Sequence, residues 1–412
     1  MTTAACILVV NGGSSSLKAA TFEAAAALRL IASATVERIG GADPLLTTAV
    51  AAQAQQRQTI NAPTHEAALD AVLKAFGSLT GALAAAGHRV VHGGPACVAP
   101  QAVTAEMLQA LRQLEPYDPE HLPAQLQLIE ILMQRLPTIP HVACFDTAFH
   151  HDLPPVARRL PLPRKFDALG IRRYGFHGIS YAYLMDHLQR IAPAEAHGRV
   201  VLAHLGNGAS LAAVRYGRCI DTTMAFTPAS GIPMGTRSGD LDPGLVDYLA
   251  RTAGFTPEQF NRMVHSESGL LGISETTGDM QQLLELESTD VRAAEAVGAF
   301  CYHVRKAIGA YAAALGGLDT LVFAGGIGEH AAPVRARICQ DLRVLGIELN
   351  PARNGDHAPV ISSGSLPVAV RVISTDEQLM IARSVLKILA DSTGSAPAGS
   401  GGDQPTDAHG PP

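Results

Sequence analysis

Two glycine-rich segments of the sequence carry groups suited to binding phosphate. Residues 11–18 read NGGSSSLK, in which two glycines allow a tight turn and serine hydroxyls, backbone N–H groups and Lys18 can face an anion. The flanks have the pattern of strands, so the segment is not a P-loop, which leads into a helix. A polar hairpin turn without a ligand is the alternative. Residues 325–329 (GGIGE) follow an expected strand at 320–324 and precede a helix that opens near Pro333, which is typical of an anion cradle.

Two arginines stand beside flexible turns, where they could neutralise an anionic substrate. Arg89 lies at the edge of a short apolar strand in HRVVHGG (residues 88–94), and Arg237 lies between glycines in MGTRSGDLDPG. A guanidinium can bind a carboxylate or phosphate through two hydrogen bonds and can stabilise the charge that develops in phosphoryl transfer. His88 and His92 share a face of the strand near Arg89, but no spaced third ligand follows, which argues against a metal site there.

A carboxylate and an imidazole follow at positions suited to catalysis. Asp146 comes directly after an expected strand at 141–145, where a carboxylate commonly orients Mg²⁺ or a nucleophile. His177 stands ahead of an expected helix, and a role in the N-cap region of that helix is the alternative. We interpret His150 and His151 as surface or capping residues. Together with the glycine-rich segments and arginines, these groups indicate a nucleotide or polyphosphate substrate.

The elements that must position these residues form an α/β fold. A capping-box start at Thr375 and Gln378 predicts a helix up to Leu389, and apolar periodicity from Asp290 predicts a long buried helix that stops at Gly316. Strands are expected near residues 5–10, 17–21, 89–91, 141–145, 200–205, 211–214 and 320–324.

A strand, a small polar turn and a second strand occur twice, half a chain apart. Asn11-Gly12-Gly13-Ser14 separates the first pair of expected strands, and Asn207-Gly208-Ala209-Ser210 separates the second. The repetition favours two related domains that each begin with a hairpin, and a chance match is the alternative.

Composition excludes several classes of protein. The 412 residues carry a net charge of −6, which provides no basic footprint for nucleic acid or an anionic membrane. No apolar stretch is long enough to span a membrane and no basic secretory start precedes residue 5, so we expect a cytoplasmic protein that acts on small molecules. The six cysteines are scattered without a CxxC pair and are expected to be reduced packing residues. Residues 391–412 are rich in Gly, Ser and Pro and are expected to be disordered.

Eight segments occur in the order found in acetate kinases and related short-chain acyl kinases, and the sequence resembles that family from residue 7 to residue 383. The segments are NGGSSSLK, HRVVHGG, FDTAFH, RYGFHG, HLGNGAS, MGTRSGDLDPG, GGIGEH and STDEQLMIAR. The resemblance implies two duplicated ribonuclease H-like domains of the sugar kinase, actin and heat-shock chaperone superfamily. The first would span residues 1–146 plus 377–390, and the second, residues 147–376, would bind the nucleotide and form the dimer. It also implies a cytoplasmic homodimer that uses Mg²⁺, or alternatively Mn²⁺, to convert ATP and acetate to ADP and acetyl phosphate.

The resemblance also implies roles for individual residues. Asn11 and Glu377 would hold the metal ion, Lys18 would lie near nucleotide phosphate, and Arg89 would bind the substrate. The expected catalytic residues are Asp146, His177 and Arg237. The expected acyl pocket consists of Val91, Tyr117, Phe176 and Pro228. The expected nucleotide site consists of His204, Leu205, Gly206, Asn207, Gly208, Asp279, Met280, Gln281, Gly326, Ile327, Gly328, Glu329 and His330.

The substrate chemistry refines the role of Asp146. A carboxylic acid with a pKa near 4 is already ionised at neutral pH, so acetate needs no general base. We therefore expect Asp146 to organise Mg²⁺ or substrate. The harder task is to bring two anions together, for which Arg89, Arg237 and the metal ion would supply positive charge.

The sequence departs from the family pattern on both sides of the expected site. Tyr117 and Asp118 stand where the family usually has an apolar residue and a histidine, so the acyl pocket would be smaller or would gain a hydroxyl, and propionate should fit worse than a small polar acid. Met280, Gln281 and His330 replace an aromatic residue, an arginine and an asparagine, from which we expect tolerance of GTP or ITP.

Three rival functions remain at this stage. The chain could phosphorylate another small carboxylate, or it could use pyrophosphate or phosphate in place of a nucleotide. It could also be a non-catalytic, actin-like switch or sensor, although such a protein would have no need for the groups expected on the acyl side.

Overall fold

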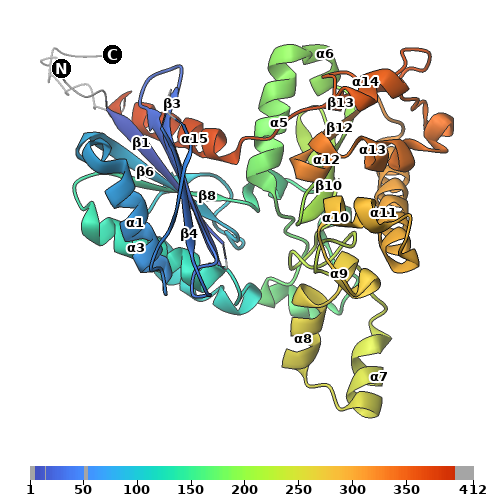
Figure 1. Ribbon diagram of the computed structural model, residues 1–412, viewed down its shortest axis with the longest axis horizontal. Helices are drawn as coiled ribbons and strands as arrows, with labels where there is room; N and C mark the ends of the chain where they lie inside the picture. Colours follow the sequence, from blue (N-terminus) through green and yellow to red (C-terminus); the bar gives the residue numbers. More distant parts are fainter. Residues whose placement is uncertain (1–4, 14, 51–53, 395–412) are drawn as a thin grey trace, which may run out of the picture.

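The computed structural model describes residues 5–13, 15–50 and 54–394, and shows a molecule built around two β-sheets (Figure 1). The first sheet has the strand order β5-β4-β3-β2-β1-β6-β8-β7. Its strands are β1 (Cys6–Gly12), β2 (Ser16–Glu23), β3 (Leu30–Glu37), β4 (Leu45–Val50), β5 (Gln56–Thr59), β6 (Leu83–Val90), β7 (Gln101–Ala102) and β8 (His141–Phe145). The second sheet has the order β11-β10-β9-β12-β13. Its strands are β9 (Arg199–Leu205), β10 (Ala209–Arg215), β11 (Arg218–Thr222), β12 (Thr320–Ala324) and β13 (Ala369–Val372).

The two sheets repeat one topology, as the sequence predicts. In each, three antiparallel strands in succession (β1–β3 and β9–β11) are followed by two strands parallel to the first of them (β6 and β8, or β12 and β13). Both expected hairpins are present, with Asn11 opposite Lys18 in one and Leu205 opposite Ala209 in the other. The α/β class and the duplication are therefore confirmed.

Helices cover both faces of each sheet. Against the first sheet, α1 and α3 pack on one face and α15 on the other, and against the second, α11 and α13 oppose α5. The helices of the first half are α1 (His65–Phe76), α2 (Ala105–Arg112) and α3 (Leu122–Arg135). Those that follow are α4 (Pro155–Arg158), α5 (Gly178–Ile191), α6 (Pro193–Ala196), α7 (Gly244–Ala253), α8 (Pro257–Ser266), α9 (Gly269–Ser274), α10 (Met280–Leu286), α11 (Val291–Leu315), α12 (Gly325–His330), α13 (Ala332–Cys339), α14 (Pro351–Gly355) and α15 (Glu377–Gly394). None of the helices in the described part of the chain is long and apolar enough to cross a membrane.

The C-terminal helix α15 returns to the first sheet. A Cβ at Gly87 of β6 would lie 2.6 Å from Ile381 and 2.7 Å from Val385, so only glycine allows the helix to approach this closely. The expected capping box is wrong, because Asp376 accepts the Leu379 N–H hydrogen bond while Thr375 contacts Ser180. The helix also runs to Gly394, past the expected start of the disordered tail, and residues 395–412 lie outside the described residues.

The other sequence-based expectations are met to different degrees. The long helix α11 begins after Asp290, whose side chain caps it, and ends at Gly316 in the left-handed conformation, as predicted. All six cysteines are buried, and none of them forms a disulfide within the described residues. Strand β6 begins at Leu83, six residues before the strand expected near residues 89–91. The sequence patterns do not predict strands β3, β4, β5, β7, β11 and β13.

Candidate active site

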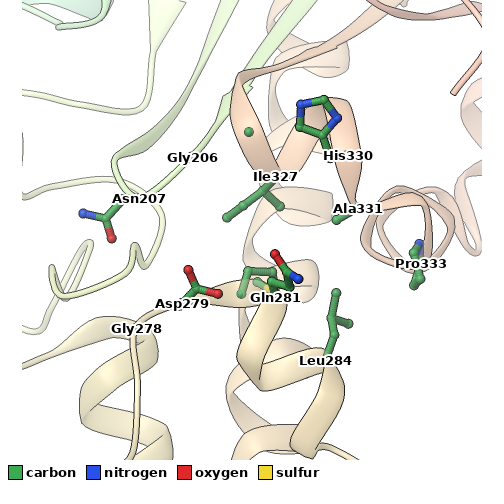
Figure 2. A pocket seen from close by; sticks show the side chains of 12 residues that line it. Gly206, Asn207, Gly278, Asp279, Gln281, Leu284, Ile327, His330, Ala331 and Pro333 are labelled. Carbon is green, nitrogen blue, oxygen red and sulfur yellow. The ribbon is translucent and has the colours of Figure 1, made fainter. Parts of the chain in front are cut away.

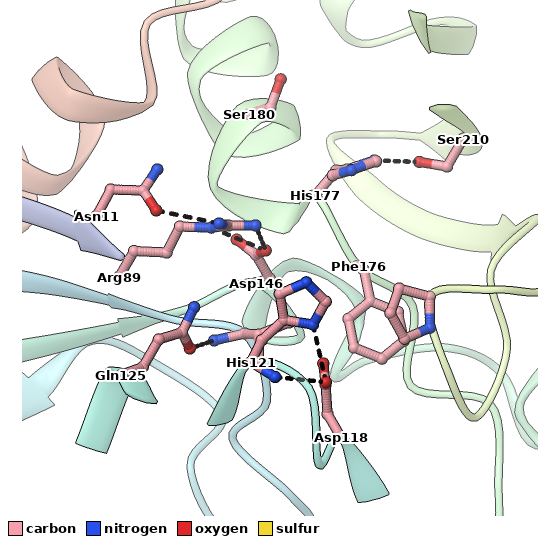
Figure 3. A network of polar contacts seen from close by, with 12 residues as sticks. Asn11, Arg89, Asp118, His121, Gln125, Asp146, Phe176, His177, Ser180 and Ser210 are labelled. Atoms are coloured by element: carbon pink, nitrogen blue, oxygen red, sulfur yellow. Dashed lines mark hydrogen bonds and ion pairs between the residues drawn. The ribbon is translucent and has the colours of Figure 1, made fainter. Parts of the chain in front are cut away.

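Three neighbouring strands of the first sheet end in polar residues that hydrogen-bond one another. Parallel strands β6 and β8 carry Arg89 near the end of one and Asp146 just after the other, and β1 carries Asn11 beside them. Asp146 Oδ2 accepts hydrogen bonds from Arg89 Nη2 at 2.6 Å and Nε at 3.1 Å, and Asn11 Oδ1 accepts from Arg89 Nη1 at 3.1 Å (Figure 3). The fold thus fixes the guanidinium by three hydrogen bonds at the carboxyl edge of the sheet.

Charge compensation keeps Arg89 protonated. Burial opposes its positive charge, but Asp146, Glu377 and Asp118 together outweigh burial and raise the pKa of Arg89. Burial also raises the pKa of Asp146, an effect that the guanidinium opposes. Asp146 Oδ1 is buried without a hydrogen-bond partner, which leaves one acceptor free for a ligand.

His177 lies at the start of α5, and its surroundings keep the imidazole neutral. Its backbone is left-handed (φ 56°), which turns the ring away from the helix, so it caps α5 by position but not by a side-chain hydrogen bond. Tyr181 Oη lies 2.5 Å from Ser210 Oγ, which lies 2.9 Å from His177 Nδ1. Burial, His204 and both arginines hold the pKa of His177 well below its ordinary value. The hydrogen bond between His177 Nδ1 and Ser210 Oγ fixes the orientation of the ring.

Arg237, from the second half of the chain, lies on the same side of Gly208 as His177. Its Nη1 donates to Pro228 O at 3.3 Å, and a Cβ at Gly208 would lie 3.6 Å from this nitrogen and 3.2 Å from His177 Nε2. Burial lowers the pKa of Arg237, Asp118 and Glu120 oppose the shift, and the charge of Arg89 adds to it. The two arginines are therefore close enough for the charge of one to act on the other. We call Asn11, Arg89, Asp146, His177 and Arg237 the charged cluster.

Aromatic rings line the apolar side of the charged cluster. The buried His92 ring makes edge contacts with Tyr117, Tyr174 and Phe176, at centroid distances of 5.4, 4.4 and 5.7 Å. Tyr117 also contacts Phe226 at 4.9 Å, and its hydroxyl donates to Leu169 O at 2.6 Å. The Tyr117 hydroxyl proton is thus used by a backbone carbonyl, and the ring occupies space between His92 and Phe226. Three further expected pocket residues are buried nearby: Val91, Phe176 and Pro228.

A larger cavity of about 440 Å³ opens beside the second sheet (Figure 2). We call it the glycine-lined pocket. Eight of its lining residues were expected from the sequence: Gly206, Asn207, Asp279, Met280, Gln281, Gly326, Ile327 and His330. Four were missed: Gly278, Leu284, Ala331 and Pro333. Ile327 and His330 of α12 face Gln281 and Leu284 of α10 across the cavity (Figure 2).

The remaining expected nucleotide residues lie outside the pocket lining. The Leu205 side chain is fully buried in the core and cannot reach a ligand. Glu329 Oε1 accepts from the backbone N–H groups of Gly325 (2.9 Å) and Thr375 (3.3 Å). Gly328 is buried within α12, Lys18 is exposed on β2, and His204 Nδ1 lies 2.8 Å from Ser180 Oγ. Burial lowers the pKa of His204 to about 4.

His88, next to Arg89, is structural. His88 Nε2 lies 2.9 Å from His141 Nδ1, and burial lowers the pKa of His88 to about 3. No group of three His, Cys, Asp or Glu side chains within the described ranges is arranged to hold a metal ion. His150 is buried and bonds Phe176 O at 2.9 Å, so the interpretation of His150 as a surface residue is wrong.

Comparisons with known proteins agree with this architecture. The acetokinase family matches residues 6–383. An acetate kinase of Rhodopseudomonas palustris is 42% identical over 93% of this chain and 98% of its own, and a propionate kinase of Citrobacter rodentium is 41% identical over 94% and 98%. The crystal structure of Porphyromonas gingivalis acetate kinase superposes with a TM-score of 0.86 at 33% identity, covering 94% of this chain and 100% of that one. The chain therefore belongs to the acetokinase family.

Proposed function

We propose that this protein transfers the γ-phosphoryl group of ATP to acetate and forms acetyl phosphate and ADP. The observation that carries the proposal is the convergence of Arg89, from the first sheet, and Arg237, from the second half, next to a cavity large enough for a nucleoside. Two like charges are costly to bury together unless anions join them. The carboxylate of acetate and the terminal phosphate of ATP are the anions that we assign to this cleft.

In the proposed reaction, one carboxylate oxygen attacks the γ-phosphorus. The new P–O bond forms as the bond to the β–γ bridging oxygen breaks, and its electron pair leaves with ADP. Arg89 and Arg237 offset the repulsion between the two anions, and the neutral His177 donates from Nε2 to a phosphoryl oxygen. Asp146 holds the guanidinium of Arg89 and takes no proton, since acetate arrives ionised.

The charged cluster fits a magnesium ion that also binds phosphate. Mg²⁺ is held in kinases by one or two carboxylates, water and substrate phosphates, so a three-residue protein cage is not needed. The free Asp146 Oδ1, the Asn11 amide oxygen and the Glu377 carboxylate are the oxygen donors that we assign to it. The ion, when bound, neutralises phosphate charge.

We further propose that the protein is cytoplasmic, that Mn²⁺ can replace Mg²⁺, and that the boundaries between its two domains lie at residues 146/147 and 376/377.

We also propose that the protein is a homodimer. Helices α7 and α8 have no buried residue and project from the body beyond α9 (Figure 1). Leu245, Val246 and Tyr248 of α7 are 37, 44 and 56% exposed, an apolar face that a second copy would cover. Val246→Asp should convert a dimer to a monomer in light scattering, and a wild-type monomer would refute this assignment.

A hydroxylamine trap tests the reaction directly, because it captures acyl phosphate as a hydroxamate. We expect product with acetate and ATP in the presence of Mg²⁺. Product with pyrophosphate but not ATP would instead identify a pyrophosphate-dependent relative. Nucleotide binding without product from any acid would support the non-catalytic switch.

A further inference from the structure

Four buried side-chain polar atoms lack a hydrogen-bond partner within the part of the chain that the structure describes, and two of them belong to residues beside the aromatic rings of the expected acyl pocket. The four are His92 Nε2, Asp118 Oδ2, Asp146 Oδ1 and Arg172 Nε. Unpaired buried polar atoms are uncommon and need an explanation, such as a ligand. Asp146 Oδ1 is assigned above to the metal ion, whereas His92 and Asp118 have no role in the proposed reaction.

His92 presents a hydrogen-bond donor. Its Nδ1 accepts the Gly94 N–H at 2.8 Å, so the neutral ring carries its proton on Nε2. Burial lowers the pKa of His92 to about 4, which keeps the ring neutral at physiological pH. The side chain is fully buried among Tyr117, Tyr174 and Phe176 and has no polar partner there for Nε2.

Asp118 presents an acceptor. Its Oδ1 accepts from the backbone N–H of His121 at 3.1 Å and from His121 Nδ1 at 2.9 Å, while Oδ2 is unpaired (Figure 3). The residue is only 4% exposed. Burial opposes ionisation, but His121 and Arg237 outweigh it and hold the pKa of Asp118 below its usual range. The carboxylate is therefore charged.

The donor and the acceptor belong to one site. The His92 ring contacts Phe176 and Tyr117, which belong to the expected acyl pocket, and Tyr117 directly precedes Asp118 in the chain; the charge of Asp118 also acts on His92. A methyl group can pair neither atom. An ammonium group could pair with Asp118 but could not accept from His92, and a second carboxylate would be repelled by Asp118.

A hydroxyl group both donates and accepts, so it alone among these substituents satisfies both atoms. Building on the proposed function, we propose that the unpaired donor at His92 and acceptor at Asp118 form a subsite for the hydroxyl of a short hydroxy acid, which the enzyme phosphorylates on its carboxylate in addition to acetate. The transfer step is the one given above, and the hydroxyl keeps its proton.

Glycolate and propionate provide a direct test, because they differ only by a hydroxyl in place of a methyl group. For the wild-type enzyme we expect kcat/KM in the hydroxylamine trap to be about 10- to 100-fold higher for glycolate, since sites with unpaired polar groups discriminate against the apolar analogue. Glycine should not be a substrate. Equal or greater kcat/KM for propionate would overturn the inference without any mutation.

Two variants test whether the preference for glycolate over propionate depends on Asp118 and His92. Asp118→Asn replaces the unpaired acceptor with an NH₂ donor and keeps the His121 contacts. His92→Asn keeps an acceptor for Gly94 but withdraws the donor from the Nε2 position, because its NH₂ group lies where Cδ2 was. Each should reduce the glycolate to propionate ratio at least fivefold, whereas the exposed Asp152→Asn should leave it unchanged. An unchanged ratio in a folded Asp118→Asn protein would overturn the inference.

The product distinguishes this inference from the proposed function. An acyl phosphate reacts with hydroxylamine and a phosphate ester does not, so an ester formed on the hydroxyl would overturn the subsite orientation. Turnover of acetate without a preference for glycolate refutes the subsite alone. Absence of acyl phosphate from every acid, acetate included, refutes the proposed function and the subsite with it.

Discussion

The charged cluster and the glycine-lined pocket are built from different parts of the polypeptide. In the charged cluster, side chains bond to side chains: Arg89 is fixed by Asp146 and Asn11, and His177 is oriented by Ser210. The glycine-lined pocket is shaped by the backbone of Gly206, Gly278 and Gly326 and by apolar side chains. Binding of two repelling anions requires fixed charges, whereas a nucleoside needs mainly space and apolar surface. Single side-chain changes should therefore have large effects in the charged cluster and small ones in the pocket.

The largest effect is expected for Arg237→Ala. Arginines that stabilise charge in phosphoryl transfer contribute about 10³ to 10⁵ in rate, so kcat should fall by about that factor while thermal stability changes little. Arg237→Lys should recover only part of it, because an ammonium lacks the planar fork. Arg190→Ala, which removes an exposed arginine paired with Asp186, is the control and should keep wild-type kcat. A loss below tenfold would place Arg237 away from the reacting phosphate.

Removal of Asp146 should damage stability as well as activity. Asp146→Asn leaves the guanidinium of Arg89 without its buried partner, and breaking such a pair costs about 3 to 5 kcal/mol. We expect a fall of that order in the free energy of unfolding and a higher Mg²⁺ concentration for half-maximal rate. The double variant Arg89→Met with Asp146→Asn should regain stability but not activity. Equal instability of the single and double variants would argue that the pair is not compensated as described.

The contrast between the two regions also explains which features could be predicted from sequence. Glycines, arginines and Asp146 stand at strand ends, where residue type and position indicate their chemistry, and the structure brings them together. Ser210 and Tyr181 orient His177 from sites up to 33 residues away, and nothing in their spacing signals this contact. Gln125 bonds both Val91 N and Gly12 O, the latter across 113 positions, and was missed for the same reason.

The fold was predictable where strands are buried and apolar. Strands β1, β8 and β12 have almost entirely buried sequences and were found. Strand β5 (QRQT) is exposed and has no apolar residue, so it has no strand pattern. Strand β3 (LIASATVE) alternates buried and less buried positions, but two of its three buried positions are alanines, so its apolar contrast is weak. The direction of the Tyr117 hydroxyl depends on Leu169, which the sequence places 52 residues away.

A substitution at a glycine beside the glycine-lined pocket should be an exception to the small effects expected there. A Cβ at Gly235 would lie 2.0 Å from Asn207 Oδ1 and 3.2 Å from Gly278 O, so Gly235→Ala must displace two residues that line the cavity. We expect KM for ATP to rise about tenfold or more with a smaller change in KM for acetate. Gly298→Ala, in α11 with no atom within 4 Å of the added Cβ, is the control. Equal effects on both substrates would contradict a local displacement.

Acid should destabilise the region around Arg89, because buried neutral histidines lie next to it. His88, with a pKa of about 3 in the folded protein, binds a proton below about pH 6.5 once unfolded. Its contribution to stability is therefore complete above pH 6.5 and is lost as the pH falls towards 3, by about 2 kcal/mol at pH 5. His88→Gln retains a donor for His141 and should lose correspondingly less stability between pH 7 and pH 5 in urea unfolding. Parallel pH curves for the two proteins would contradict this account.

The smallest effect is expected at the base end of the glycine-lined pocket. Met280, Gln281 and His330 line this end of the pocket, and Met280 is only 4% exposed. Few side chains of the pocket can therefore recognise the amino group of adenine. Gln281→Ala should change KM for ATP by less than about threefold, and kcat/KM for GTP or ITP should lie within about tenfold of that for ATP. Because Met280 and Gln281 provide neither an aromatic ring nor a cation, discrimination has to come from shape and from the single ring of His330. Strict rejection of both GTP and ITP by the wild-type enzyme would mean that backbone groups of α10 or α12 read the base, and the pocket would then be as specific as the charged cluster.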